Sequence, residues 1–369
     1  MSDILNRLPV SYEGSHIYDI VYSENFEGLK EFFDEYNPQK TKKICIVSDS
    51  KVASFYMDAI LNITSPYFSK VVNYVFDEGE ESKNLDTVRS LYVKLIEEHF
   101  DRKDVLMALG GGVTGDMCGY AAATYLRGID FIQVPTSLLA CVDSSIGGKT
   151  GVDFDQYKNM VGAFHMPKLV YINLSAMDSL DKRQFWSGMG EVVKSALIKD
   201  SEFFDWMTVS NIKPDADKSN LEYVITACNK IKKAVVEADP HEITGERALL
   251  NFGHTLGHAI EKYMDFQLLH GECVSIGCIM ASIISRNKNL ISESDVQRIS
   301  SFIKDNFELP KLPQDIDIDK IISYTHSDKK VSGNIVKFIL LESIGNAIIR
   351  TDVSDDDMKE AFEEYMNGQ

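Results

Sequence analysis

The feature that most constrains the fold is a series of short apolar runs in the first half of the chain. Each run is rich in Val, Ile and Leu and ends at polar or glycine residues, and the runs cover residues 43–49, 71–76, 104–110, 129–135 and 168–174. Continuous apolar runs of this length are typical of strands buried on both faces of a parallel sheet. Segments with helical character separate them, over residues 50–61, 84–99 and 115–124. This order predicts an α/β fold built on a doubly wound, Rossmann-like parallel sheet.

The pattern changes near residue 180, where helical periodicity takes over. The predicted helices cover residues 181–207, 219–238, 246–264, 271–289 and 293–307. The run NIVKFILLESIGNAIIR then predicts a hairpin, and a last helix follows over residues 354–366. A length of 369 residues favours two domains. We therefore expect an α/β domain over residues 1–178 and a mostly helical domain over residues 179–369.

The composition argues against several classes of protein, among them nucleic-acid-binding and membrane-spanning proteins. The net charge of −18 argues against a nucleic-acid partner, because duplex binding needs a basic face. The sequence has no apolar run near the ~20 residues that a bilayer span requires, and its first residues carry no signal-peptide pattern. The six cysteines are scattered without a CxxC motif, which predicts reduced thiols in a cytoplasmic protein. An anionic substrate would need cations gathered locally against this overall charge.

A glycine-rich turn follows the run that ends at residue 110. Gly110, Gly112 and Gly115 match G-x-G-x-x-G between a predicted strand and a predicted helix, where backbone N–H groups can meet a pyrophosphate. The acidic partner of a ribose would be Asp49 or Glu80. The alternative is an ordinary structural turn beside solvated acids.

A second glycine-rich segment, DSSIGGKTG, covers residues 143–151. Asp143 stands where a Walker A loop requires glycine, so an ATPase phosphate loop is excluded. Lys149, in an expected flexible loop, still suits a phosphate or carboxylate, and Lys158 and Asn159 add polar groups nearby. Taken singly, each lysine would more often be solvated surface, and it is their concentration here that favours a binding role.

The strongest chemical signal is a cluster of histidines. Asn251, His254, His258 and Glu261 follow one another at spacings of three, four and three, which predicts one face of a single helix, and His270 comes shortly afterwards. Imidazole is a common zinc ligand and proton carrier. Thr255 stands where the H-E-x-x-H motif has glutamate, so a metallopeptidase is excluded.

A catalytic zinc site uses three protein ligands and one open position. The candidates are His254, His258 and His270 together with a carboxylate. Glu191 is such a carboxylate on a predicted amphipathic helix, with Lys194 on the same face. Spacing leaves the choice among these ligands open, and two hydrogen-bonded core histidines are the alternative.

Several segments, in this order and spacing, resemble the 3-dehydroquinate synthase family of sugar-phosphate cyclases. They are GGGVTGDMCGYAAATYLRGI, VPTSLLACVDSSIGGKTGVD, KNMVGAFH, GMGEVVK, RALLNFGHTLGHAIE and LLHGECVSIG. The resemblance implies a fold shared with glycerol dehydrogenase and iron-containing alcohol dehydrogenases. It also implies NAD, one divalent metal ion (zinc, with cobalt as the alternative), a homodimer, and a step of the shikimate pathway to chorismate and the aromatic amino acids.

The implied reaction converts 3-deoxy-arabino-heptulosonate 7-phosphate into 3-dehydroquinate and phosphate, through transient oxidation, phosphate elimination, re-reduction and aldol cyclisation. The resemblance implies the metal ligands Glu191, His254 and His270. It implies catalytic roles for Lys149, Lys194, Asn251 and His258. The implied NAD contacts are Asp49, Glu80, Lys83, Gly112, Val113, Thr114, Gly115, Asp116, Thr136, Ser137, Lys149, Lys158 and Ser179. The implied substrate contacts are Arg127 (reaching across a dimer interface), Asp143, Lys149, Asn159, Lys194, Lys232, Arg247, Asn251, His258, His270, Lys329 and Lys330.

Three other functions remain as alternatives at this point. The first is a different sugar-phosphate cyclase with the same apparatus, such as an inosose or amino-dehydroquinate synthase. The second is an NAD- and metal-dependent polyol dehydrogenase of the same fold, which would accumulate NADH. The third is a catalytically inactive binding protein, which would require the loss of a ligand or key lysine, and the sequence retains them all.

Overall fold

A computed structural model of the chain describes residues 4–155, 157–214, 217–326, 331–332 and 335–369. The predicted substrate residues Lys329 and Lys330 lie outside the described residues. The chain forms two compact units, one of Met1–Asp181 with Asp217–His241 and the other of Lys182–Ala216 with Glu242–Gln369. Helix α7 (Lys218–Ala238), which we expected in the second half, thus belongs to the first unit.

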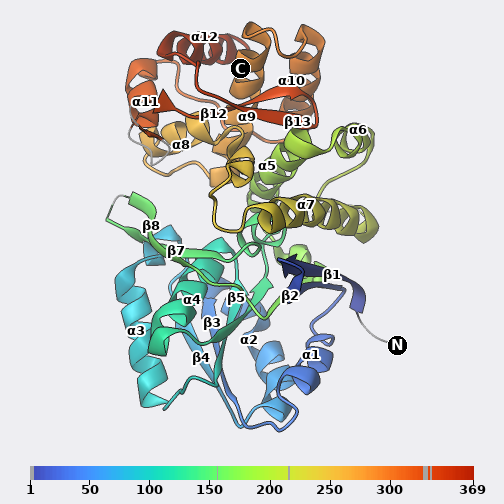
Figure 1. Cartoon of the computed structure of the whole chain (residues 1–369), viewed down its shortest axis with the longest axis vertical. Helices are drawn as coiled ribbons and strands as arrows, with labels where there is room; N and C mark the ends of the chain where they lie inside the picture. The colour runs from blue at the N-terminus through green and yellow to red at the C-terminus, as the bar shows by residue number, and fades with distance from the viewer. Residues whose placement is uncertain (1–3, 156, 215–216, 327–330, 333–334) are drawn as a thin grey trace. The chain divides into compact units, whose positions relative to one another are not determined.

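A seven-stranded sheet with the order β1-β2-β9-β6-β5-β3-β4 forms the centre of the first unit (Figure 1). The five predicted parallel strands are confirmed as β3 (Lys43–Asp49), β4 (Lys70–Phe76), β5 (Val105–Gly110), β6 (Asp130–Pro135) and β9 (Leu169–Asn173). An antiparallel hairpin of β1 (Ile4–Tyr12) and β2 (Ser15–Ser23), which we did not predict, extends the sheet beside β9.

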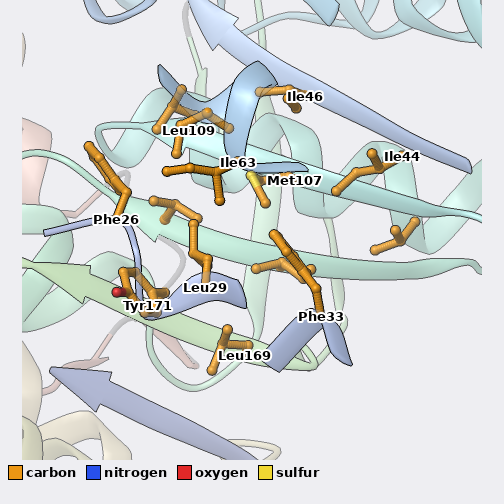
Figure 2. Packing of buried hydrophobic residues seen from close by; sticks show 14 of the residues in the cluster. Phe26, Leu29, Phe33, Ile44, Ile46, Ile63, Met107, Leu109, Leu169 and Tyr171 are labelled. Carbon is orange, nitrogen blue, oxygen red and sulfur yellow. The ribbon is translucent and has the colours of Figure 1, made fainter. Parts of the chain in front are cut away.

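Both faces of this sheet are buried, which explains the continuous apolar runs. Ile44 and Ile46 of β3 pack into one core cluster with Phe33 of helix α1 (Leu29–Tyr36), and helix α2 (Ser50–Thr64) covers the same face (Figure 2). The alternate residues Cys45 and Val47 pack into a second cluster with helices α3 (Leu85–Glu97) and α4 (Gly112–Thr124). Helices on both faces confirm the doubly wound fold.

The strand order also indicates at which edge of the sheet a ligand would be expected to bind. Strand β3 lies between β4 and β5, so the chain turns from one side of β3 to the other between these two strands. In open α/β sheets, ligands bind beside the carboxyl ends of the strands at such a switch point. Asp49 ends β3 and Gly110 ends β5, so both lie at this edge.

The segment after β6 differs from the expected flexible loop. Residues Ala140–Ser144 form a short helical turn, η4, and Lys149 is the first residue of strand β7 (Lys149–Phe154), which pairs with β8 (Tyr157–Phe164). The prediction of a loop at Lys149 was wrong. The glycine and polar residues of this segment are typical of a loop, but the segment leads into a β-hairpin. Other short turns are η1 (Ser65–Tyr67), η2 (Glu80–Ser82), η3 (Tyr125–Arg127) and η5 (Leu174–Ser179).

The second unit is mostly helical, as predicted. Helix α9 (His270–Asn287) is buried along most of its length and packs against α5 (Lys182–Lys199) and α8 (His254–Tyr263). Around these lie α6 (Ser201–Val209), η6 (Glu246–Asn251), α10 (Glu293–Asn306), α11 (Ile318–Thr325), α12 (Asp355–Asn367), the predicted hairpin of β12 (Phe338–Ser343) and β13 (Asn346–Arg350), and the short pair β10 (Val331–Ser332) and β11 (Ile335–Val336). Among the described residues, no helix is both long enough and apolar enough to cross a bilayer.

Two predicted helices are each divided in two. The prediction of a single helix over 246–264 was wrong, because Gly253, with φ of 77°, separates η6 from α8. A Cβ at Gly253 would lie 2.8 Å from the carbonyl oxygen of Val274, so α9 approaches too closely for any other residue. The predicted helix 181–207 likewise breaks at Asp200, whose side chain caps α6.

Candidate active-site clusters

Three helices of the second unit bring together the predicted metal-binding residues. Glu191 lies on α5, His254 and His258 lie on α8, and His270 begins α9. Candidate ligand atoms of the three histidines all lie within 4.8 Å of one another. Glu191 Oε1 lies 3.1 Å from His270 Nε2 and 3.4 Å from His254 Nε2. We call these four residues the histidine cluster.

Burial and charge set the protonation of this cluster. Glu191 and Lys194 are each 1% exposed, and Lys194 Nζ lies 2.5 Å from Glu191 Oε2. Burial opposes ionisation of Glu191, but Lys194 and His254 outweigh it and hold the pKa of Glu191 well below its usual value. Burial lowers the pKa of His254 to about 4, although Glu191 acts in the opposite direction. The carboxylate is therefore an anion in a buried place, as a metal ligand must be.

A further carboxylate orients His270. Glu261, on α8, is buried, and its Oε2 lies 3.4 Å from His270 Nδ1. Burial disfavours the charged form of His270, but hydrogen bonds with Glu191 and Glu261 outweigh burial and raise the pKa of His270 to about 10. The metal-free His270 is therefore protonated, and a metal ion that it binds would displace the proton of the ligating nitrogen. A carboxylate behind a ligating histidine is the usual outer partner of zinc sites. Sequence reasoning put Glu261 on this helix face without a role, and the only signal was its spacing of three from His258.

The remaining predicted residues of this unit lie on η6 before α8. Arg247 is 2% exposed, and Asn251 is the last residue of η6, where its Nδ2 donates to the carbonyl of Ala248 at 3.1 Å. Asn251 therefore reaches this region from a separate helical turn and not from the helix that carries His254.

The predicted dinucleotide turn of the first unit joins β5 to α4. Helix α4 begins at Gly112, so its first N–H groups have no acceptor within the helix. A Cβ at Gly112 would lie 3.1 Å from Ser144 Oγ, and one at Gly115 would lie 2.8 Å from Gln133 Oε1 on β6. Glycine thus keeps the turn open and lets α4 pack closely on the sheet, as a pyrophosphate-binding turn requires. Thr114 Oγ1 donates to Asp49 Oδ2 at 3.4 Å and ties this turn to the end of β3.

Lys83, Asp116 and Asn159 form the second part of the candidate cofactor region. Lys83 is 5% exposed, and its Nζ donates to Asp116 Oδ2 at 2.8 Å and to Asn159 Oδ1 at 2.7 Å. Burial alone would lower the pKa of Lys83, but Asp116 and Glu80 outweigh it and raise this pKa to about 12. Lys158 Nζ lies 3.8 Å from Glu80 Oε1, a looser pair at the same hairpin.

Three further predicted cofactor contacts, Thr136, Ser137 and Ser179, have hydrogen-bond partners within the first unit. The amide of Thr136 donates to the carbonyl of Gly110 at 3.0 Å, so this buried threonine lies beside the glycine turn. Ser137 Oγ accepts from the amide of Ala140 at 3.3 Å. Ser179 is exposed at the end of η5, and its hydroxyl lies 2.5 Å from that of Tyr56.

The structure also separates the two adjacent lysines of α7. Lys232 is 7% exposed and donates to the carbonyl oxygen and to Oδ1 of Asp143, each at 2.6 Å. Lys233 instead lies 3.6 Å from Glu237 on the same helix. Lys232 is thus the lysine that adjoins a predicted substrate residue. Arg127 is exposed on η3 with φ of 70°.

These residues fit the cofactors that the sequence implied. Imidazole nitrogens and an ionised carboxylate are ligands that zinc takes, and three of these four side chains would leave one position open for a substrate. The open glycine turn at a helix start, next to an acidic residue that ends β3, fits the phosphates and ribose of a dinucleotide.

Solved structures share this architecture over nearly the whole chain. The 2-deoxy-scyllo-inosose synthase complexed with carbaglucose-6-phosphate, NAD+ and Co2+ is 28% identical, with a TM-score of 0.87, over 97% of this chain and 99% of that one. The 2-epi-5-epi-valiolone synthase of Streptomyces hygroscopicus, with NAD+ and Zn2+ bound, is 25% identical, with a TM-score of 0.84, over 98% and 100%. An iron-containing alcohol dehydrogenase, 13% identical with a TM-score of 0.63 over 97% and 100%, shares the fold alone. The chain is therefore an enzyme with the fold of the sugar-phosphate cyclases.

Sequence relatives narrow this class further. Residues 73–187 match the 3-dehydroquinate synthase N-terminal family, and residues 188–331 match the 3-dehydroquinate synthase C-terminal family. The 3-dehydroquinate synthase of Acetivibrio thermocellus is 42% identical over 86% of this chain and 88% of its own length, and that of Shewanella pealeana is 42% identical over 95% and 97%. The chain belongs to the 3-dehydroquinate synthase family, which confirms the resemblance, and it is a carbon–oxygen lyase of that type.

Proposed function

We propose that the chain converts 3-deoxy-arabino-heptulosonate 7-phosphate into 3-dehydroquinate and phosphate, using NAD and Zn2+, as a cytoplasmic homodimer. The observation that carries the proposal is the contact of one buried, ionised carboxylate, Glu191, with two imidazoles beside a buried lysine. Membership of the 3-dehydroquinate synthase family supports the same substrate.

In this proposal Glu191, His254 and His270 hold the metal ion. Glu191 Oε1 is in contact with Nε2 of both histidines, so the three atoms face a common point. The His258 ring centroid lies 5.1 Å from that of His254 and 5.6 Å from that of His270, close enough to act on a substrate bound at the ion. The geometry would also allow His258 to bind the ion, since its candidate ligand atom lies within 4.8 Å of those of His254 and His270. We assign His258 to proton transfer and not to ligation because the family resemblance implies that role.

When bound, NAD+ would take up and return a hydride, and the metal ion would stabilise negative charge on the alcohol oxygen as a Lewis acid. The protein residues supply binding and orientation around this chemistry. Asp49 and the glycine turn, with Thr114 and Asp116, hold the dinucleotide. Lys83 and Lys158 fix the acidic side chains around it.

The cations hold the phosphate and carboxylate of the substrate. We assign this role to Lys149, Lys194, Lys232, Arg247 and, from the second protomer, Arg127. Asp143, Asn159 and Asn251 orient the hydroxyl groups and the phosphate. Substrate fixed in this way needs little further reorganisation before it reacts, and such positioning contributes several kcal/mol to catalysis.

The deciding experiment supplies the heptulosonate phosphate with NAD+ at a catalytic concentration and with Zn2+, and follows phosphate release together with absorbance from NADH. We expect phosphate release to exceed the added NAD+ many-fold without lasting NADH. A protein that releases no phosphate under these conditions would contradict the proposed function.

The two enzymatic alternatives give different results in parallel assays. A polyol dehydrogenase would accumulate NADH steadily from glycerol. A different cyclase would release phosphate from another sugar phosphate, such as a hexose phosphate, faster than from the heptulosonate phosphate. We expect the enzyme to prefer the heptulosonate phosphate, because the relatives from Acetivibrio thermocellus and Shewanella pealeana, each 42% identical to this chain, are 3-dehydroquinate synthases.

A further inference from the structure

Asp153 occupies a central position among the proposed ligand-binding residues of the first unit, although neither the sequence motifs nor the resemblance assigned it a role. It is the fifth residue of strand β7 and is partly buried. Its amide donates to the carbonyl of Lys83 at 2.8 Å, and its Oδ1 accepts from the amide of Asn159 at 2.6 Å. Asp153 therefore binds the backbones of two residues whose side chains also bind each other.

These contacts close a ring. Lys83 Nζ donates to Asn159 Oδ1 at 2.7 Å, while the Lys83 carbonyl and the Asn159 amide are both held by Asp153. The same Nζ donates to Asp116 Oδ2 at 2.8 Å on α4, the helix that begins at the dinucleotide turn. The ring thus connects a proposed substrate residue, Asn159, to proposed cofactor residues through one aspartate.

The backbone of Asn159 shows why this support matters. Its φ is 51°, in the left-handed region, which asparagine adopts more readily than most residues other than glycine, and this turn of the backbone directs the Asn159 amide toward Asp153. The pairing of β7 with β8 is irregular between Val152 and Phe154, so the regular ladder is interrupted at Asp153 itself. At this point the carboxylate of Asp153 provides the acceptor that fixes the Asn159 amide.

The orientation of the Asn159 side chain follows from the same contacts. Lysine can only donate, so Lys83 fixes the Oδ1 end of the side-chain amide, and Nδ2 is the end that donates to other groups. Without Asp153, the backbone under Asn159 would lose its fixed acceptor, and the contact with Lys83 would no longer set this orientation.

We propose that Asp153 is a positioning residue that couples the dinucleotide-binding side chains Lys83 and Asp116 to the substrate-binding amide of Asn159. The assignment of these three ligand roles rests on the proposed function. The position of Asp153 between them rests on its own contacts.

The test compares Asp153→Ala with Asp153→Asn, which keeps an oxygen that can accept from the Asn159 amide. Asp155→Asn is the matched control, because it removes a carboxylate from the same hairpin at an exposed residue with φ of 53°, a conformation that asparagine tolerates. The first readout is calorimetric titration of NAD+ into the zinc-loaded protein without substrate. The second is the KM for the heptulosonate phosphate, measured separately from kcat.

We expect Asp153→Ala to raise the substrate KM by about tenfold, the factor for a lost hydrogen bond to a charged group. NAD+ binding should weaken by a smaller factor, through the contact of Lys83 with Asn159, because the backbone amide of Asp153 keeps its bond to the Lys83 carbonyl. Asp153→Asn should stay within about twofold of the wild type in both, and Asp155→Asn should match the wild type. If the alanine variant fails to fold, Asp153→Ser, whose hydroxyl is too short to reach the Asn159 amide, should give the same losses.

Two results would overturn the proposal: wild-type NAD+ affinity and KM in the alanine or serine variant, or equal losses in Asp153→Asn. A wild-type protein that releases no phosphate would instead refute the proposed function. In that case the NAD+ titrations would still decide whether Asp153 positions the cofactor residues.

Discussion

Replacing Glu191 by glutamine tests the metal ligands most directly. The substitution keeps the shape of the side chain and removes its charge. It weakens three contacts, with Lys194 at 2.5 Å, His270 at 3.1 Å and His254 at 3.4 Å. The amide still offers one oxygen as an acceptor, but it is a poor ligand for zinc. We expect the purified variant to contain little zinc.

The effect on stability follows from burial. Lys194 is 1% exposed, so the variant leaves a buried ammonium without its anionic partner. Breaking a buried ion pair from one side costs about 3–5 kcal/mol, and the remaining amide oxygen favours the lower end. A loss of about 3 kcal/mol would lower Tm by roughly 6–12 °C for a unit of this size. Both proteins should be compared in the metal-free form, so that zinc loss does not contribute.

The effect on turnover is expected to be larger. Loss of the ion removes several kcal/mol of charge stabilisation, so phosphate release should fall by at least ~10³-fold. Glu202→Gln, at an exposed position of α6, is the control for removal of a carboxylate elsewhere in this unit. Metal content by elemental analysis, Tm and phosphate release are the three measurements. A Glu191→Gln variant with full zinc content and wild-type turnover would refute the ligand assignment, and an unchanged Tm in the metal-free form would refute the argument from burial.

Three other substitutions test separate parts of the site. Glu261→Gln removes the carboxylate behind His270 and should weaken zinc binding by about 10–100-fold in a competition with a chelator; unchanged affinity would show that Glu261 does not orient this histidine. Lys83→Met should weaken NAD+ binding by about tenfold or more in a calorimetric titration while zinc content stays at the wild-type value, and the opposite pattern would contradict its place in the cofactor region. Lys232→Met should raise the KM for the heptulosonate phosphate by about tenfold, whereas Lys233→Met should not; equal effects would mean that only overall charge matters.

The sequence predicted the sheet well because its strands are buried on both sides. In β3, Ile44 and Ile46 face one core and Cys45 and Val47 face the other, so residues 44–47 are all apolar and the run is easy to recognise. The β1–β2 hairpin was missed because β1 is largely exposed, and a strand with little burial has no strong hydrophobic pattern. The break at Gly253 was missed because the apolar periodicity continues through it, and only the close approach of α9 requires it.

For the candidate site, too, the sequence predicted some features and could not predict others. Residue type and spacing gave the three histidines as candidates, and the structure brings them together with Glu191. The choice of ligands among them came from the family resemblance and stays a prediction. Spacing could not show that Glu261 would contact His270, because that contact depends on how the start of α9 packs against α8. The choice between Lys232 and Lys233 likewise needed the turn η4, which brings Asp143 to one of these lysines and not to the other.

Buried ion pairs help to explain how a strongly acidic protein could bind an anionic substrate. A protein with a net charge of −18 repels an anionic substrate at long range, yet the proposed ligands include a phosphate and a carboxylate. Within each unit, a buried lysine proposed to bind the substrate has a carboxylate partner: Lys232 pairs with Asp143 in the first unit, and Lys194 pairs with Glu191 in the second. Each partner fixes the position of its lysine before the substrate arrives. The substrate therefore meets oriented donors at short range, where hydrogen bonds outweigh the distant repulsion because salt screens charges beyond about 8 Å. Removing one of these carboxylates should accordingly weaken substrate binding, even though it makes the protein less negative.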